Sequence, residues 1–467
     1  MLPDDVLLTI FDFYVYQSPS YAIEWVGFSH EQRKIELWHS LVHVCRRWRG
    51  IVFTSPRRLN MRLRCTTRTP ARETLDIWPA LPLVIRGDVS EKSVDNVIAE
   101  LKLSDRISQI ELNCYTTSQI ENLCTAMKVP FPELTGLYLS CGSFGYAPVL
   151  PGSFLGGSAP RLRHLALVAF PLSGLSNLFL STTSLVDLFL LHIPHFGYIS
   201  PAAMVTCLST LTSLERVELQ FESPQSSPDQ ETRRSPSPTR CILPALMMFQ
   251  FKGVDEYLED LVARIDTPRL RRLEAAFFND IEFHTPELIR FVSRSSTLRE
   301  PNKAHVLFDS QTASVKLQPQ ASNEEYFEVT ISCREPDWQL SSLAQICTTS
   351  SPLLSTTENL IICEPARTQL DWKDGIECIE WLELLLPFPA VKNLYLSKQF
   401  APRIAPALQE MTDDGTIEIL PTLQNLYLEG FRPSESVEGG IERFISARQL
   451  TDHPVVISVW DRNLERD

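Results

Sequence analysis

Two histidine pairs are the side chains of this chain whose types and spacing come nearest to a site for chemistry. His39 and His43 lie one helical turn apart, with Glu36 and Cys45 close by in the sequence. Imidazole and thiolate groups at such spacing can bind zinc. No further ligand with matching spacing closes a four-ligand set, so we expect no metal at this place.

The second pair, His192 and His195, flanks Pro194 and is typical of a surface turn. The chain contains no Gly-x-x-x-x-Gly-Lys, Gly-x-Gly-x-x-Gly, Gly-x-Ser-x-Gly or His-Glu-x-x-His motif. Its 17 glycines leave little material for loops that cradle phosphates. We therefore expect no catalytic residues, no cofactor and no enzymatic activity. The alternative is an enzyme whose site forms only when the chain folds.

Composition indicates a folded chain with an uneven charge. The 467 residues exceed one ordinary compact core, so the chain holds several domains or one long repeat domain. Residues 1–75 carry 11 Lys and Arg against 7 Asp and Glu, and the remainder carries 32 against 50. The acidic remainder argues against nucleic acid as a ligand. The basic head suits an acidic protein partner.

Cysteine usage and hydropathy indicate the compartment. The 11 cysteines are scattered without any Cys-x-x-Cys pair, which favours free buried thiols over a disulfide framework. No apolar run reaches the ~18 residues that a membrane-spanning helix needs. Pro3, Asp4 and Asp5 stand where a signal peptide would be basic. We expect an intracellular protein, cytoplasmic or nuclear, that does not bind membranes.

The first 65 residues have the periodicity of helices. Apolar residues recur at helical spacing from Val6 to Tyr14 and again between His30 and Phe53. The Ser55-Pro56 pair ends the second stretch. Residues 16–31 separate the two as a loop. The apolar positions of the second helix are Ile35, Trp38, Leu41, Val42, Cys45, Trp48 and Val52.

A Leu-x-x-Leu-x-Leu pattern returns throughout the rest of the chain. Its cleanest copies begin at Leu134, Leu162 and Leu185, and further copies begin at 107, 214, 270, 391 and 423. The central positions 110, 137, 165, 188 and 217 are 23 to 29 residues apart. This period matches leucine-rich repeats, which span roughly 20–29 residues and contribute one strand each. The sequence therefore predicts an α/β body of stacked strands.

Two stretches interrupt the repeats. Residues 223–240 (SPQSSPDQETRRSPSPTR) have no large apolar side chain and are predicted to be a disordered loop. Ser235 and Ser237 resemble kinase sites, but a tolerated insertion is the favoured interpretation, because exposed loop tips accept such inserts freely. Within 299–350, the segments 306–308, 315–317 and 327–332 alternate like strands but fit no clean repeat.

The head resembles the F-box motif, which opens with Leu-Pro and a Val/Ile-Leu-x-x-Ile-Phe helix and closes with Val-Cys-Arg-x-Trp-Arg. Here the two halves read Leu2-Pro3-Asp4-Asp5-Val6-Leu7-Leu8-Thr9-Ile10-Phe11 and Val44-Cys45-Arg46-Arg47-Trp48-Arg49. The segments 55–60 and 75–83 resemble a large family of fungal F-box proteins. The resemblance implies an F-box at 1–65, a bridge at 66–82 and an irregular leucine-rich-repeat-like solenoid at 83–467.

The chain departs from these patterns at two places. The gap between the halves of the motif is longer than usual, so residues 16–34 form an insertion relative to the motif. Typical repeats also carry Asn three residues past the last strand leucine, where it bonds neighbouring backbone groups. That position holds other residues here, so an asparagine ladder is not expected. The residues are Gly142, Phe170, Ile193, Glu222, Gln399 and Phe431.

The resemblance implies bridging between proteins. The head would bind a Skp-type adaptor, the adaptor a cullin, and the body an unknown substrate protein for ubiquitylation. A scaffold that does not recruit the cullin is the alternative. The residues expected to bind the adaptor are Leu2, Pro3, Val6, Leu7, Ile10, Phe11, Leu41, Val44, Cys45 and Trp48.

The substrate would meet the strand residues that alternate with the core leucines. The candidates for this role are Tyr138, Phe189, Glu218, Tyr395 and Tyr427. The three tyrosines share one slot of the repeat, and exposed Tyr suits recognition. The preference of Tyr for strands explains the same pattern without a function.

Overall fold

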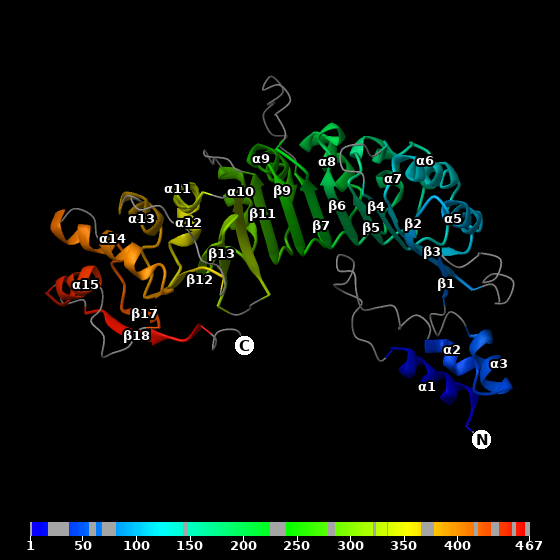
Figure 1. The fold of residues 1–467 in the computed structure, drawn as a ribbon, viewed down its shortest axis with the longest axis horizontal. Helices are drawn as coiled ribbons and strands as arrows, with labels where there is room; N and C mark the ends of the chain where they lie inside the picture. Colours follow the sequence, from blue (N-terminus) through cyan, green and yellow to red (C-terminus); the bar gives the residue numbers. More distant parts are fainter. Residues whose placement is uncertain are drawn as a thin grey trace. The chain divides into compact units, whose positions relative to one another are not determined.

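In the computed structural model, the chain folds into two compact units, Met1–Leu185 and Val186–Asp467 (Figure 1). The described residues are 2–16, 37–55, 62–67, 81–142, 148–224, 240–278, 285–320, 324–333, 335–365, 378–414, 419–430, 439–450 and 454–462. Most of the expected bridge at 66–82 and loop at 223–240 lies outside these ranges.

Within its described residues, the first unit begins with the helices α1 (Asp4–Tyr16), α2 (Leu37–Val42) and α3 (Arg46–Thr54). Asp4 and Asp5 in the first turn of α1 favour its start, because carboxylates stabilise the positive end of the helix dipole. The expected helix from residue 30 to 53 is wrong within the described residues. The helix ends at Val42, and Cys45 takes an extended conformation. The Cys45 Sγ accepts a hydrogen bond from the Trp48 N–H and caps α3.

The parallel strands of the first unit follow in sequence order. They are β1 (Leu63–Thr66), β2 (Leu83–Val89), β3 (Ile107–Cys114), β4 (Gly136–Cys141) and β5 (His164–Val168). Strand β1 pairs with β2, so residues 63–66 belong to this sheet and cross the boundary expected at residue 65. The helical segments α5 (Val94–Leu101), α6 (Thr117–Ala126) and η2 (Phe154–Gly157) lie between the strands, and η3 (Leu172–Gly174) and α7 (Ser176–Ser181) follow β5.

The second unit continues the alternation of strand and helix. Its sheet has the order β6-β7-β9-β11-β14-β13-β12-β15-β16-β17-β18. The strands are β6 (Asp187–Ile193), β7 (Arg216–Phe221), β9 (Met248–Gly253), β11 (Arg272–Phe278), β12 (Lys303–Phe308), β13 (Thr312–Gln318), β14 (Tyr326–Ser332), β15 (Asn359–Cys363), β16 (Asn393–Leu396), β17 (Asn425–Glu429) and β18 (Val456–Trp460). Strands β8 (Cys241–Ile242) and β10 (Ile265–Asp266) form a separate two-stranded sheet.

The helices of this unit connect the strands and lie along one side of them (Figure 1). They are η4 (His195–Gly197), α8 (Pro201–Leu208), α9 (Asp255–Ala263), α10 (Pro286–Arg294), α11 (Pro336–Thr349), α12 (Ser351–Leu354), α13 (Cys378–Leu385), α14 (Ala401–Asp414) and α15 (Gly439–Leu450). Among the helices of the described residues, none combines the length and apolar character that crossing a bilayer requires.

The repeating leucines build the core, as the sequence predicts. Leu137 and Leu165 are register partners in β4 and β5, and both are fully buried. The first leucine of each copy, such as Leu162, lies in the turn before the strand and is buried as well. Burying one such side chain contributes about 1.5–3 kcal/mol, so this pattern supplies the main stabilisation of each repeat. The expected mixed α/β class with a large parallel sheet is confirmed.

The three expected strands within 299–350 are present, and their pairing explains why they fit no repeat. Strand β14 is parallel to β11, and β12 is parallel to β15. Strand β13 runs antiparallel between them. The segment is therefore a three-stranded meander inserted into an otherwise parallel sheet.

Candidate functional site

The residues expected to bind an adaptor divide into a buried and an exposed group. Leu7, Phe11 and Leu41 are buried between the three helices of the head. The half-buried Trp48 ring packs edge-on against Phe11, with their centroids 4.6 Å apart. These four side chains form the internal core of the head, where α1 packs against α2 and α3. The structure thus places Leu7, Phe11 and Leu41 inside the head, and their contact with an adaptor stays a prediction.

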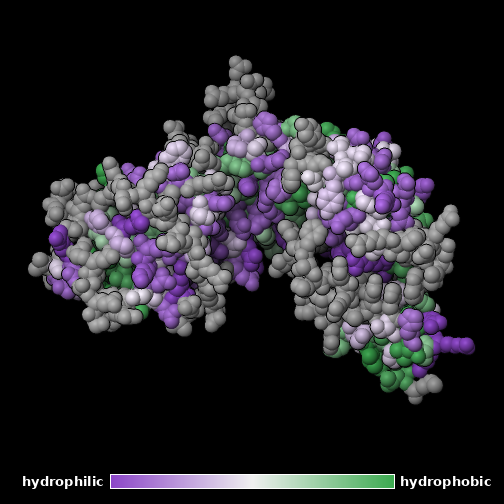
Figure 2. Space-filling model, viewed as in Figure 1, coloured by the Kyte–Doolittle hydropathy of each residue, from purple (hydrophilic) through white to green (hydrophobic). Residues whose placement is uncertain are grey.

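The exposed group leaves an apolar surface on the same helices. The exposed fractions are 51% for Leu2, 42% for Val6, 46% for Ile10 and 58% for Val44. Pro3 and Cys45 are exposed as well. Figure 2 shows hydrophobic side chains gathered over α1–α3. We call the residues Leu2, Pro3, Val6, Ile10 and Val44 the head surface.

Two further side chains belong to this exposed group, although they are not among the predicted adaptor-binding residues. Phe13 is 67% exposed and Tyr14 is 43% exposed. Phe13 follows Ile10 by three positions and Tyr14 follows it by four, so both extend the face of α1 that carries Val6 and Ile10. The helical spacing already contained this signal, because a helix of 13 residues with apolar side chains on two faces cannot bury both in so small a head.

A clamp that the sequence did not predict holds the start of the head surface in place. The Arg47 guanidinium donates to the backbone carbonyl of Leu2 at 2.6 Å and to Asp4 Oδ1 at 2.5 Å. Both side chains are substantially exposed, so the ion pair itself contributes little to stability. Its effect is positional, because it fixes Leu2 and Pro3 beside α3.

The strand residues expected to meet a substrate are less exposed than predicted. Tyr138, Phe189 and Glu218 are each more than nine-tenths buried. Side chains of adjacent strands lie beside them. Tyr138 lies between Glu111 and Ala166 of the adjacent strands, and the Arg216 guanidinium lies 5.8 Å from the centre of the Phe189 ring. Arg216 is held there by Asp187, at 2.5 and 2.7 Å.

Around Glu218, the second unit carries a row of polar side chains on the strands. The register places Glu218, Gln250, Glu274 and Glu328 next to one another on β7, β9, β11 and β14. Gln250 Nε2 donates to Glu274 Oε2 at 2.7 Å, and the Tyr326 hydroxyl donates to Glu274 Oε1. Burial raises the pKa of Glu218 and Glu328 above the ordinary value, and the Glu274 charge adds to both shifts.

Two tyrosines in the expected slot form a half-buried aromatic surface. Tyr395 and Tyr427 are register partners whose rings stack with centroids 4.4 Å apart and an interplanar angle of 7°. Trp460 meets Tyr395 edge-on at 5.7 Å. The three rings pack against Ile361 and Cys363 of β15. Large aromatic side chains on a rigid support are typical centres of protein interfaces.

An asparagine ladder lies beside this aromatic surface, at the start of the strands and not three residues past their last leucine. Asn425 Nδ2 donates to Asn393 Oδ1 at 2.8 Å, and Asn393 Nδ2 donates to Asn359 Oδ1 at 2.9 Å. Asn359 Nδ2 in turn donates to Asn302 Oδ1 at 2.8 Å. The expectation of no ladder is therefore wrong. The ladder stands at the start of the strands, two residues before the tyrosine slot, and ties consecutive repeats together.

Metal binding and nucleophilic chemistry find little support among the described residues. No group of three His, Cys, Asp or Glu side chains in these ranges could hold a metal ion. Of the ten cysteines described, eight are buried and all are free thiols. Burial raises the pKa of Cys114 and Cys124 to about 12, which leaves very little reactive thiolate near neutral pH.

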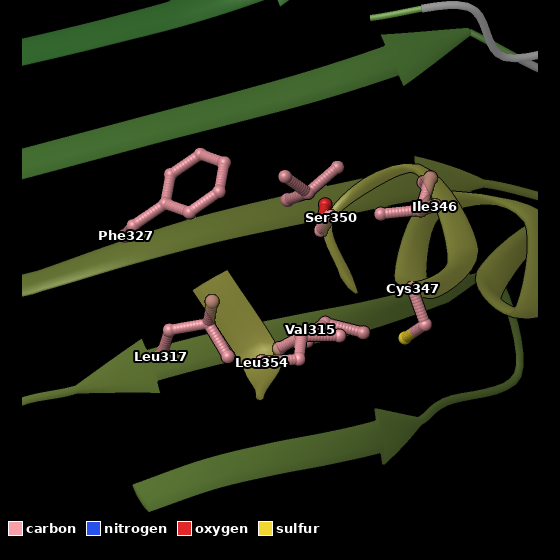
Figure 3. A pocket seen from close by; sticks show the side chains of 8 residues that line it. Val315, Leu317, Phe327, Ile346, Cys347, Ser350 and Leu354 are labelled. Atoms are coloured by element: carbon pink, nitrogen blue, oxygen red, sulfur yellow. The ribbon is translucent and has the colours of Figure 1, made fainter. Parts of the chain in front are cut away.

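A small apolar cavity in the second unit is a packing void. It lies between the strands β13 and β14 and the helices α11 and α12 (Figure 3). Its volume is about 10 Å³, barely the room that one water molecule needs. Val315, Phe327, Ile346 and Leu354 are among its lining residues, and Ser350 is the polar member. It is too small to hold a substrate.

Comparisons with known proteins identify no family for this chain. No family model matches the sequence, and no curated protein matches it. Among solved structures, a leucine-rich repeat-containing protein from Legionella pneumophila, LegL7, is similar to this chain with 14% identity and a TM-score of 0.29. The likeness covers 85% of this chain and 98% of that one. At this distance it assigns neither a family nor a function.

Proposed function

We propose that this chain is the substrate-recognition subunit of a ubiquitin ligase of the Skp–cullin–F-box type. The head would bind a Skp-type adaptor, and the strand-built body would bind the substrate protein. The observation that carries the proposal is the head surface. It coincides with the two halves of the sequence that resemble an F-box motif.

The physical argument is that the head buries one set of apolar side chains and exposes another. Phe11 and Leu41 give the three helices a core of their own. Val6, Ile10 and Val44 remain exposed, although burying side chains of this size would gain about 1.5–3 kcal/mol each. A contiguous apolar surface on a small helical head favours a protein partner. The excess of basic residues in the head favours an acidic one.

The body would act by proximity. A receptor that holds a substrate beside a ubiquitin-charged enzyme raises the effective concentration of the reacting groups, so the receptor itself needs no catalytic residue. The aromatic surface of Tyr395 and Tyr427, which the buried Trp460 supports, is the part of the described strands best suited to hold a protein. It combines large rings with a rigid register.

The test is binding of the full chain to a purified fungal Skp-type adaptor, measured by isothermal titration calorimetry. Ile10→Asp places a charge on the head surface at an exposed position, so we expect the head to stay folded and the dissociation constant to rise at least tenfold. Leu180→Asp on α7 is the matched control, because Leu180 is also an exposed leucine-sized side chain, at 58%. It should leave binding unchanged.

Circular dichroism of both variants would establish that the fold is intact. Absence of binding by the wild-type chain, or equal binding by wild type and Ile10→Asp, would refute the adaptor assignment.

The alternative function is a scaffold that binds the adaptor but does not deliver a substrate to the ligase. It is distinguished by adding a cullin to the adaptor complex. The proposed receptor should form the three-component complex and support ubiquitin transfer to bound proteins. A scaffold should stop at the pair of chain and adaptor.

A further inference from the structure

Strand β18 is the end of the sheet in the second unit, and its outer edge pairs with no other strand among the described residues. It pairs in parallel with β17 over five positions, from Asn425↔Val456 to Glu429↔Trp460. The Val456 N–H donates inward to the Gln424 carbonyl at 2.8 Å. Because backbone groups alternate along a strand, Ile457 and Val459 direct their N–H and C=O groups to the outer edge.

The apolar core rows of the sheet run out at this strand without a polar cap. Leu396, Leu428 and Val459 occupy one row through their register, and their exposed fractions are 0%, 5% and 51%. Ile457 continues the neighbouring row from Leu426, which is fully buried. Terminal repeats of stacked folds ordinarily present a polar outer side. The row therefore ends on an apolar residue that a further strand would cover.

Within its five residues, Val456–Trp460, the strand lacks charged side chains and proline, two of the features that keep an edge from pairing. Natural edge strands ordinarily use Lys, Pro or a bulge to prevent association. The pairing with β17 contains no register shift. Another extended backbone would satisfy outward groups at two-residue spacing and would also cover Val459, so a strand suits this edge best.

We infer that β18 pairs antiparallel with β18 of a second copy of this chain, joining the two copies into a symmetric dimer. The strand is self-complementary in the register that centres on Ser458. Ile457 then stands opposite Val459 of the second copy, and both residues have the outward backbone groups that a hydrogen-bonded pair requires. The two side chains lie on the same face, so the apolar rows continue across the two-fold axis. This inference is independent of the proposed ligase function.

The test uses the full chain, with its mass measured by sedimentation velocity over a range of concentrations. We expect a monomer–dimer equilibrium in the wild type. Val459→Lys should raise the dimer dissociation constant at least tenfold, since a lysine on each copy would face its partner at the edge. Val149→Lys is the matched control, because Val149 is equally exposed, at 52%, but lies outside any strand. It should leave the equilibrium unchanged.

A second variant tests the register even if Val459→Lys disturbs folding. Ser458 would face Ser458 of the second copy at a position where Cα atoms are about 4.5 Å apart, which suits a disulfide. Ser458→Cys should form a covalent dimer under mild oxidation by oxidised glutathione, well above the wild-type background from its own cysteines.

A wild-type chain that is monomeric at every concentration would overturn the inference and leave the edge to a strand of another protein. Equal dimerisation by wild type and a folded Val459→Lys variant would also overturn it, as would loss of the dimer in Val149→Lys. Failure of Ser458→Cys to cross-link above background would contradict the register.

Discussion

Glu100 is a buried carboxyl group of the first unit, where burial disfavours its charged form. We therefore expect the stability of this unit to depend on pH in a specific way. Glu100 lies on α5 and is fully buried. Its Oε1 accepts from Asn96 Nδ2 at 3.4 Å, and its Oε2 has no hydrogen-bond partner among the described residues. Burial raises the pKa of Glu100 to about 8, against 4.5 for the free side chain.

The sign of the effect follows from which state binds more protons. Between pH 4.5 and about 8, the folded chain keeps Glu100 protonated while the unfolded chain ionises it. The folded state therefore binds more protons in this window, and the free energy of unfolding falls as pH rises. One pKa unit corresponds to about 1.4 kcal/mol, so the loss across the whole window reaches at most roughly 5 kcal/mol.

Glu100→Gln removes the titration and keeps the size of the side chain and its acceptor for Asn96. We expect the variant to be more stable than the wild type by a few kcal/mol at pH 9, with the difference shrinking toward pH 5. The measurement is urea unfolding at pH 5 to 9, followed by circular dichroism. Glu91→Gln, at an exposed position just before α5, is the control and should leave the pH profile unchanged. A difference between Glu100→Gln and wild type that does not vary with pH would refute the reasoning.

Three further substitutions test the packing. Asn393→Ala removes the middle of the asparagine ladder and two hydrogen bonds. Urea unfolding should show that the free energy of unfolding falls by about 1–3 kcal/mol. An unchanged free energy of unfolding would mean that the ladder does not stabilise the fold. Phe11→Ala should lower the stability of the head by about 3–5 kcal/mol and unfold it, because Phe11 is fully buried. Adaptor binding and the helical circular dichroism signal of the head should then both be lost. A variant that stays folded would contradict the assignment of Phe11 to the core. Tyr257→Phe should keep or raise the melting temperature, because the Tyr257 hydroxyl is buried without a hydrogen-bond partner in the described residues, and a large drop would reveal one.

The head shows why helices are easier to predict from sequence than the side on which they bind. The spacing from Val6 to Tyr14 predicts α1 correctly, because helical periodicity is a local property. Leu7 and Ile10 have the same chemistry, yet one is buried and the other is exposed. Which face packs inward depends on where α2 and α3 lie. That placement is set by the break at Cys45 and by the Arg47 clamp. The clamp joins Arg47 to Asp4, more than 40 positions away in the sequence.

The body shows the same limit for strands. Alternating side chains predict β12, β13 and β14 individually, because alternation is local. Their arrangement as a meander, with β13 antiparallel to both neighbours, depends on pairing between distant segments. The burial of Glu218 has the same origin. An outward position in one strand is covered when the adjacent strands place long side chains beside it.

The asparagine ladder could have been predicted from the sequence, because residues at the same position of stacked repeats become neighbours in space. Asn-Leu-Tyr-Leu occurs at 393–396 and again at 425–428, and Asn359-Leu360 begins the preceding strand in the same way. When parallel strands pair without a shift, identical residues in one slot stand next to each other. Amides then bond in a chain and tyrosines stack. A side chain that recurs at the same position of successive repeats therefore predicts its own contacts. The position at which a typical repeat places asparagine is a poorer guide to them. By the same reasoning, Val456 in the asparagine slot of β18 ends the ladder at the edge where the strand is left apolar.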